Sequence, residues 1–163
     1  MHYSARMTLV ALVFATTMSV AATGRLTGTL LFSNFVCFSF VPLLQLATGL
    51  LMLRGSRLER GAALDGYFAT HRAWSLWALL MAGIVLILPN PGGATYTLAL
   101  TAVVPAAMTI RSLLRFSRNC LGDSSRAAWW RVARHQAATV VILLVYLDLS
   151  VALWPRVVAV LGR

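Results

Sequence analysis

Residues Ala137–Trp154 read AATVVILLVYLDLSVALW, with Asp148 as the only charged side chain among them. As an α-helix this stretch would extend about 27 Å at 1.5 Å per residue, close to the roughly 30 Å thickness of a bilayer's hydrocarbon core. No polar face interrupts it, as one would in a surface helix of a soluble protein. The stretch therefore predicts a membrane-spanning helix.

Earlier apolar stretches extend the same pattern through the chain, and we predict one span from each of Met7–Gly24, Leu30–Leu53, Ala73–Pro89 and Tyr96–Ile110, the last continuing to about Phe116. Residues 1–163 are thus expected to form a single transmembrane domain, an all-α bundle of about five helices. The alternative is four spans preceded by an N-terminal apolar segment, which is either retained or cleaved as a secretory signal.

Composition agrees with a membrane protein, because 60% of the residues are apolar and only 11% are charged. The net charge of +10 would be typical of a nucleic-acid binder if the basic residues lined one face. They instead lie between apolar stretches, so we do not expect nucleic acid as a partner. All basic residues are arginine, a bias that indicates a GC-rich bacterial genome and hence a bacterial inner membrane.

Charge asymmetry between the connections predicts the orientation. Arginines fill the connection after the second span and the one after the fourth, whereas residues 90–95 form an uncharged Pro-Gly-Gly turn. The positive-inside rule places the arginine-rich connections, and the N-terminus, in the cytoplasm. We expect these connections to form short amphipathic helices on anionic headgroups, with the surface contacts made by Arg54, Arg57, Arg60, Arg115, Arg118, Arg131 and Arg134.

Proline and histidine recur at similar spacing in the two halves of the chain. Pro42 precedes His71, and Pro105 precedes His135, by about the same number of positions. Residues 30–89 and 96–155 could therefore be tandem helical hairpins, as in transporters with parallel repeats. The alternative is coincidence, because both residue types are common near helix ends.

The chain carries little catalytic equipment. Its acidic residues are Glu59, Asp65, Asp123 and Asp148, which leave no closely spaced carboxylate pair. No nucleophile elbow, phosphate-binding glycine loop or metal-ligand spacing is present, and Cys37 and Cys120 are interpreted as free thiols. The sequence favours a non-enzymatic protein, and no metal site or cofactor is predicted.

Both His71 and His135 are expected near the cytoplasmic boundary, each at the start of a span. The preferred interpretation is an interfacial polar residue at each position. Two imidazoles on neighbouring helices can also supply both axial ligands of haem b, which makes an electron carrier the alternative.

Asp148 is costly in a hydrocarbon core, by about 2.5–3.5 kcal/mol on an insertion scale, so we expect it to be paired, protonated or next to a cavity. Its predicted partner is Arg25, at the outer end of the first span. Other polar side chains within spans, Asn34, Gln45 and Thr101, are interpreted as interhelical hydrogen-bonding groups.

These features predict a small accessory or scaffolding subunit that packs against other subunits of a bacterial membrane complex. Besides the haem-binding carrier, a small transporter or channel built around Asp148 is the further alternative. The sequence identifies neither a substrate nor a partner.

Overall fold

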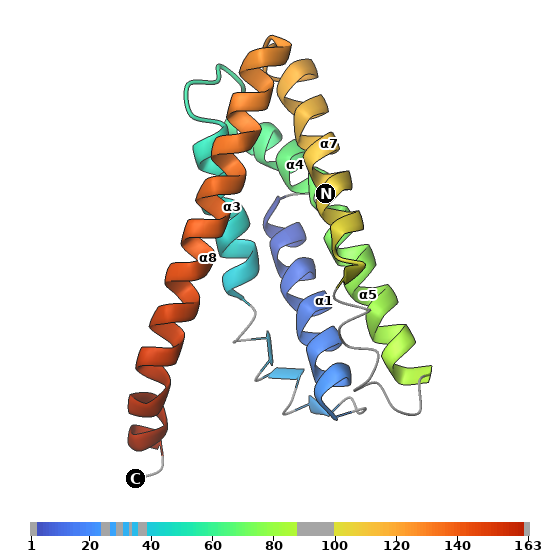
Figure 1. The fold of residues 1–163 in the computed structure, drawn as a ribbon, viewed down its shortest axis with the longest axis vertical. Coiled ribbons are helices and arrows are strands. Elements are labelled where there is room, and N and C mark those ends of the chain that lie inside the picture. The colour runs from blue at the N-terminus through green and yellow to red at the C-terminus, as the bar shows by residue number, and fades with distance from the viewer. Residues whose placement is uncertain are drawn as a thin grey trace.

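The structure is a computed structural model that describes residues 3–23, 27–28, 31–32, 34–35, 39–87 and 100–161. Within these ranges the regular elements are all helices, without a strand. They are α1 (Tyr3–Thr23), α3 (Phe40–Met52), α4 (Arg60–Thr70), α5 (Arg72–Ile87), α7 (Val103–Asn119) and α8 (Ser125–Leu161). In Figure 1, α1 lies beside α5, and α3 lies beside the first half of the long α8. The predicted all-α fold is therefore confirmed for the described residues.

Prolines set the starts of two helices. Pro42 is the third residue of α3, and Pro105 is the third residue of α7. Proline lacks an N–H group, and the first turn of a helix is where that loss is harmless. The predicted spans began earlier, at Leu30 and Tyr96. Both prolines hold equivalent places in their helices, but the internal repeat itself stays a prediction.

The arginine-rich connections are more ordered than we predicted. The first contains α4, which buries Tyr67 and Phe68 against neighbouring helices, and its contact with headgroups stays a prediction. In the second, α7 continues to Asn119 and α8 begins at Ser125, so that only a short turn separates them. Gly122 in this turn has φ +71°, a left-handed conformation that suits glycine.

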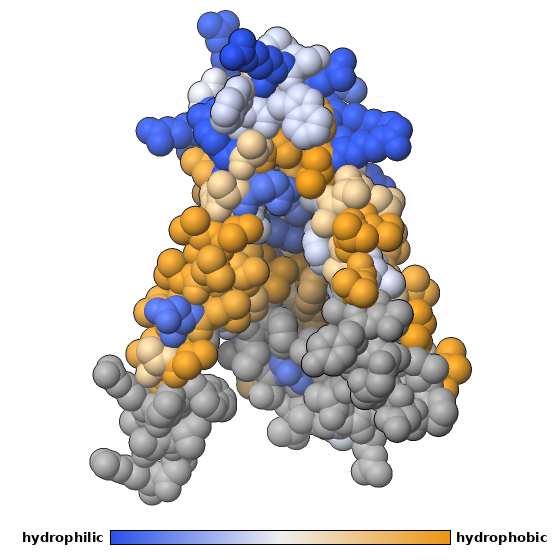
Figure 2. Space-filling model, viewed as in Figure 1, coloured by the Kyte–Doolittle hydropathy of each residue, from blue (hydrophilic) through white to orange (hydrophobic). Residues whose placement is uncertain are grey.

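The main apolar core lies where α3, α4, α7 and α8 meet, at the end of the molecule that carries the arginine-rich connections. Its buried members are Met52, Leu53, Ala63, Leu64, Tyr67, Phe68, Leu113, Phe116 and Val132. Figure 2 shows hydrophilic side chains gathered at this end, with apolar side chains exposed along α8 beyond it. The molecule thus has one polar end, and the exposed surface of α8 beyond that end is apolar.

One helix in the described part of the chain, over Ser125–Leu153, is long and apolar enough to cross a membrane. Its span overlaps the predicted Ala137–Trp154, and Phe40–Met52 is a shorter apolar helix. Exposed apolar residues include Leu144, Val151 and, on α5, Leu80. Association with a membrane is thereby weakly supported, whereas the five spans and their orientation stay predictions.

Candidate functional site

A cavity of about 230 Å³ lies among α1, α3, α5, α7 and α8, and both His71 and His135 line it. Apolar residues such as Phe14, Phe40 and Leu143 form part of its wall. Polar side chains also line it, namely Gln45, Thr48, His71, Thr109, His135, Gln136 and Thr139. A cavity between helices of a bundle is a common place for a small-molecule site.

His71 and His135 meet in this cavity, with ring centroids 5.6 Å apart. Only 7% and 3% of their respective surfaces are exposed, so both imidazoles are buried among the helices, and their place at the membrane boundary stays a prediction. His71 is the C-cap of α4, at the junction with α5, whereas His135 lies within the continuous helix α8. The tertiary fold therefore brings together two residues that sequence analysis could only pair by analogy.

Tyr67 connects the histidine pair to α3. Its hydroxyl oxygen lies 2.8 Å from Thr48 Oγ1 and 2.6 Å from His135 Nε2. Tyr67 is completely buried, and burial raises the pKa of its hydroxyl above the usual range, so that it stays protonated. The three side chains form a neutral chain of hydrogen bonds that joins α3, α4 and α8.

The neighbouring acceptors indicate which atom donates in each of these hydrogen bonds. Thr48 Oγ1 donates to the carbonyl oxygen of Leu44 at 2.8 Å, so it accepts the hydrogen bond from Tyr67. The Tyr67 oxygen then accepts from the Nε2–H group of His135. In this neutral tautomer, Nδ1 of His135 carries a lone pair and is a hydrogen-bond acceptor.

His71 is held by the end of α4. Thr70 Oγ1 donates to the carbonyl oxygen of Tyr67 at 2.7 Å, and the Nδ1–H group of His71 donates to Thr70 Oγ1 at 2.9 Å. Burial, together with the neighbouring His135, lowers the pKa of His71 to about 3. At neutral pH, His71 is therefore an uncharged imidazole with its Nε2 lone pair free to accept.

Three residues that line the cavity each have a buried polar atom without a hydrogen-bond partner among the described residues. These atoms are Gln45 Oε1, Thr109 Oγ1 and His135 Nδ1. Buried polar atoms in native proteins are almost always satisfied, and each unmet one costs about 1–3 kcal/mol. All three atoms belong to residues that line one cavity, which is consistent with a site for water or a small polar molecule. Because two of the three are acceptors, the complementary molecule carries hydrogen-bond donors.

The histidine pair does not fit haem b as it is arranged. Bis-histidine ligation places the iron and its macrocycle between the two imidazoles. Here the ring of Tyr67 lies against both, with centroid distances of 4.8 Å to His71 and 5.6 Å to His135, and its hydroxyl occupies Nε2 of His135. Among the described residues, no group of three or more potential metal-binding side chains is formed either.

Asp148 is exposed on α8 and does not line the cavity. It makes no ion pair with another described residue. Arg25 lies outside the described residues, so the pairing of these two stays a prediction. Two of the predicted hydrogen-bonding residues have partners in other segments: Asn34 donates to Ser19 Oγ at 3.0 Å, and the Trp77 indole donates to Thr101 Oγ1 at 2.8 Å. The third, Gln45, has no partner for its Oε1 among the described residues.

The predicted membrane-surface arginines are exposed except for Arg131, which is partly buried. Sequence analysis missed Tyr67, Thr48 and Thr109 as members of the polar cluster. A signal existed for two of them, because Tyr67 precedes His71 by four positions and Thr48 follows Gln45 by three. These spacings place both pairs on common faces of helices.

No family model, curated protein or solved structure matches this chain. Function must therefore be inferred from the cavity and the helices around it.

Proposed function

We propose that this chain is a multi-pass protein of a bacterial inner membrane that binds a small, neutral, polar solute within its helix bundle. The observation that carries the proposal is that three buried polar atoms without a partner among the described residues, Gln45 Oε1, Thr109 Oγ1 and His135 Nδ1, belong to side chains that line one cavity. A solute with hydroxyl or amide N–H groups complements these atoms. Binding at such a site is the first step of transport across a membrane.

Membrane insertion is supported by the exterior of the molecule. The second half of α8 exposes apolar side chains such as Val141, Val145 and Leu149. Apart from Asp148, the described side chains of this half of α8 are apolar on its exposed faces, and such a helix belongs in a protein core or in lipid. With the arginine-rich end in the cytoplasm, the cavity would lie just inside the membrane from that end.

A neutral solute follows from the charges around the cavity. None of the side chains that line it is a carboxylate, so a cation would have no counter-charge. His71 is uncharged at neutral pH because its pKa is about 3, so it gives an anion no cationic partner. Lone pairs of the acceptors would also repel an anion. A transporter is thus favoured, with its site at the histidine pair instead of at Asp148.

Uptake by proteoliposomes tests the proposal. Purified protein is reconstituted in phosphatidylcholine vesicles, and permeation of glycerol and of acetamide is followed by stopped-flow light scattering. We expect faster permeation than in protein-free vesicles for at least one of the two solutes. Gln45→Met and Thr109→Val preserve side-chain size but remove polar atoms, and they should return permeation to the background. Thr8→Val is the control, because Thr8 lies at an exposed hydrogen bond outside the cavity.

Permeation at the background rate for both solutes, with the unmodified protein, would contradict transport.

An accessory subunit is the second candidate, favoured by the broad apolar surface of α8, which would pack against a larger membrane protein. Purification from native membranes in mild detergent tests it, because a larger protein should then co-purify in fixed stoichiometry. An absorbance spectrum of the same sample tests the haem-binding alternative, and we expect no Soret band.

A further inference from the structure

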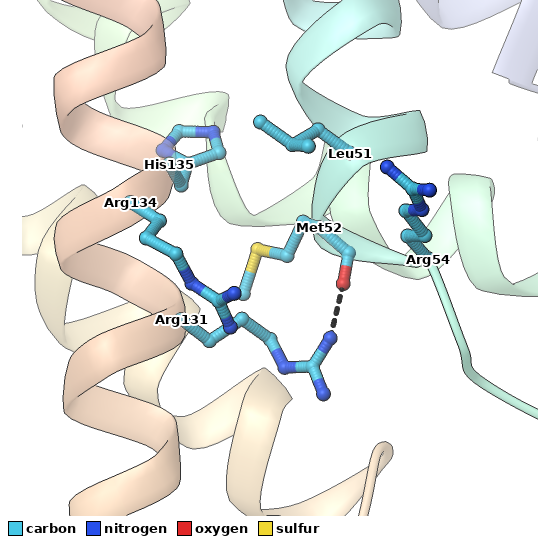
Figure 3. Close-up of a pocket in the computed structure, with 6 residues that line it drawn as sticks. All are labelled: Leu51, Met52, Arg54, Arg131, Arg134 and His135. Atoms are coloured by element: carbon cyan, nitrogen blue, oxygen red, sulfur yellow. Dashed lines mark hydrogen bonds between the residues drawn. The ribbon is translucent and has the colours of Figure 1, made fainter.

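A second cavity, of about 280 Å³, lies at the polar end between the end of α3 and the beginning of α8. Figure 3 shows its lining residues, Leu51, Met52, Arg54, Arg131, Arg134 and His135. Arg134 extends from α8 toward α3, whereas Arg54 lies on the α3 side. Three arginines, Arg54, Arg131 and Arg134, are thus among the residues that line this cavity.

Arg131 has a structural role in this group. Its Nη1 donates to the carbonyl oxygen of Met52 at 2.7 Å, at the C-terminal end of α3. Its Nε and Nη2 bind the two carboxylate oxygens of Asp123 at 2.6 and 3.1 Å. Ser117 Oγ also donates to Asp123, which fixes the carboxylate. Asp123 therefore neutralises Arg131 and holds the wall of the cavity in place.

Within the described part of the chain, the positive charges of Arg54 and Arg134 are not neutralised by an ion pair in this way. Neither forms an ion pair with any described residue, and both are exposed. Arginine presents a planar fork of N–H donors that matches the oxygen atoms of a phosphate group. Both residues line the same cavity, so two such forks are available beside it.

We propose that this cavity binds the phosphate group of an anionic phospholipid. Its lining supports a lipid over a soluble phosphate, because arginines and apolar residues of α3 line it together. Leu51 lines the cavity and is 45% exposed, and the preceding Leu50 is 49% exposed, so acyl chains have an apolar surface beside the arginines. The inference rests on the proposed membrane location but not on the solute cavity.

Native mass spectrometry tests the site directly. Protein in detergent is mixed with phosphatidylglycerol or with phosphatidylcholine, and the lipid-bound fraction is measured. We expect retained phosphatidylglycerol, and about thirtyfold weaker binding in the double variant Arg54→Gln/Arg134→Gln, because each arginine contributes roughly fivefold near an anionic surface. Arg57→Gln/Arg126→Gln is the matched control, since it removes the same charge from exposed positions outside the cavity.

Equal loss of binding in the two double variants would overturn the site, because it would show that net charge alone accounts for lipid binding. Thermal stabilisation by glycerol phosphate as large as that by phosphatidylglycerol, at equal concentration, would overturn the lipid. Solute permeation measured in phosphatidylcholine vesicles should be unchanged in Arg54→Gln/Arg134→Gln. The lipid site and the solute cavity can thus fail separately.

Discussion

His135 Nε2 lies 2.6 Å from the hydroxyl oxygen of Tyr67, which joins α8 to α4 across 68 positions of the chain. The same hydroxyl lies 2.8 Å from Thr48 on α3, so one buried oxygen atom connects three helices. With Thr48 donating to its own helix, the neutral His135 carries its hydrogen on Nε2, and its Nδ1 has no partner among the described residues. Removing the hydroxyl should therefore affect both stability and the cavity.

Tyr67→Phe should lower the free energy of unfolding by about 1–3 kcal/mol, because it leaves the Nε2–H group of His135 buried without an acceptor. Thr48→Val removes the other partner, so the double variant Tyr67→Phe/Thr48→Val should cost less than the sum of the single changes. Denaturation in detergent measures all three. Additive effects, or no effect of Tyr67→Phe, would show that the hydroxyl does not connect these helices.

Gly49→Ala should destabilise the protein by about 1–3 kcal/mol through overpacking. A Cβ atom at Gly49 would lie 2.7 Å from Cε1 of Tyr67, whose ring is completely buried and cannot move aside easily. Gly83→Ala on α5 is the control, because a Cβ there meets nothing within 4 Å. It should be neutral or stabilise by up to about 1 kcal/mol through helix propensity. Melting temperatures in the same detergent would compare them, and equal values would contradict the close packing.

Because of Asp123, the stability of the folded protein should fall as the pH becomes acidic. The hydrogen bond from Arg131 holds the pKa of this carboxyl below its usual range, with a further contribution from Ser117. A lowered folded-state pKa stabilises the protein above the unfolded-state value of about 3.9, and this stabilisation is lost as the pH falls toward the folded-state pKa. Asp123→Asn should therefore be less stable at pH 7 and lose less stability below pH ~4. Parallel stability profiles for the two proteins would contradict the ion pair.

Cys120 gives a test of orientation, because it is exposed in the short connection between α7 and α8. In a Cys37→Ala background, an impermeant thiol reagent should label Cys120 in permeabilised cells but not in intact cells. A single cysteine placed in Pro91–Ala94, with Cys37 and Cys120 replaced, should show the reverse pattern. Labelling of Cys120 in intact cells would reverse the proposed orientation.

Apolar stretches in the sequence predicted the helices well, because hydrophobicity is a local property. The boundaries were less accurate where a helix is decided by packing. Residues 60–70 carry Arg60 and Asp65 and looked like a surface connection, yet α4 buries Tyr67 and Phe68 in the core. Only the tertiary arrangement shows which face of such a mixed helix is covered.

Only part of the candidate site could be predicted from the sequence. His71 and His135 were recognised as unusual, but their burial and their contact through Tyr67 depend on how α4 and α8 pack. Asp148 attracted a functional interpretation as the only acidic residue in a predicted span, whereas it is exposed and apart from the cavity. Thr109 carried no signal, because a threonine in an apolar helix usually donates to its own backbone.

Accessibility of position 109 tests the central claim, a polar solute cavity within the bundle, most directly. Thr109 and Leu113 lie one turn apart on α7 and are 2% and 0% exposed, but only Thr109 lines the cavity. Thr109→Cys and Leu113→Cys, each with Cys37 and Cys120 replaced, are treated in membrane vesicles with the neutral reagent 2-hydroxyethyl methanethiosulfonate. We predict that Thr109→Cys reacts, that excess of a transported solute slows the reaction, and that Leu113→Cys stays unreactive. Reaction of Thr109→Cys no faster than that of Leu113→Cys would contradict the cavity and the function inferred from it.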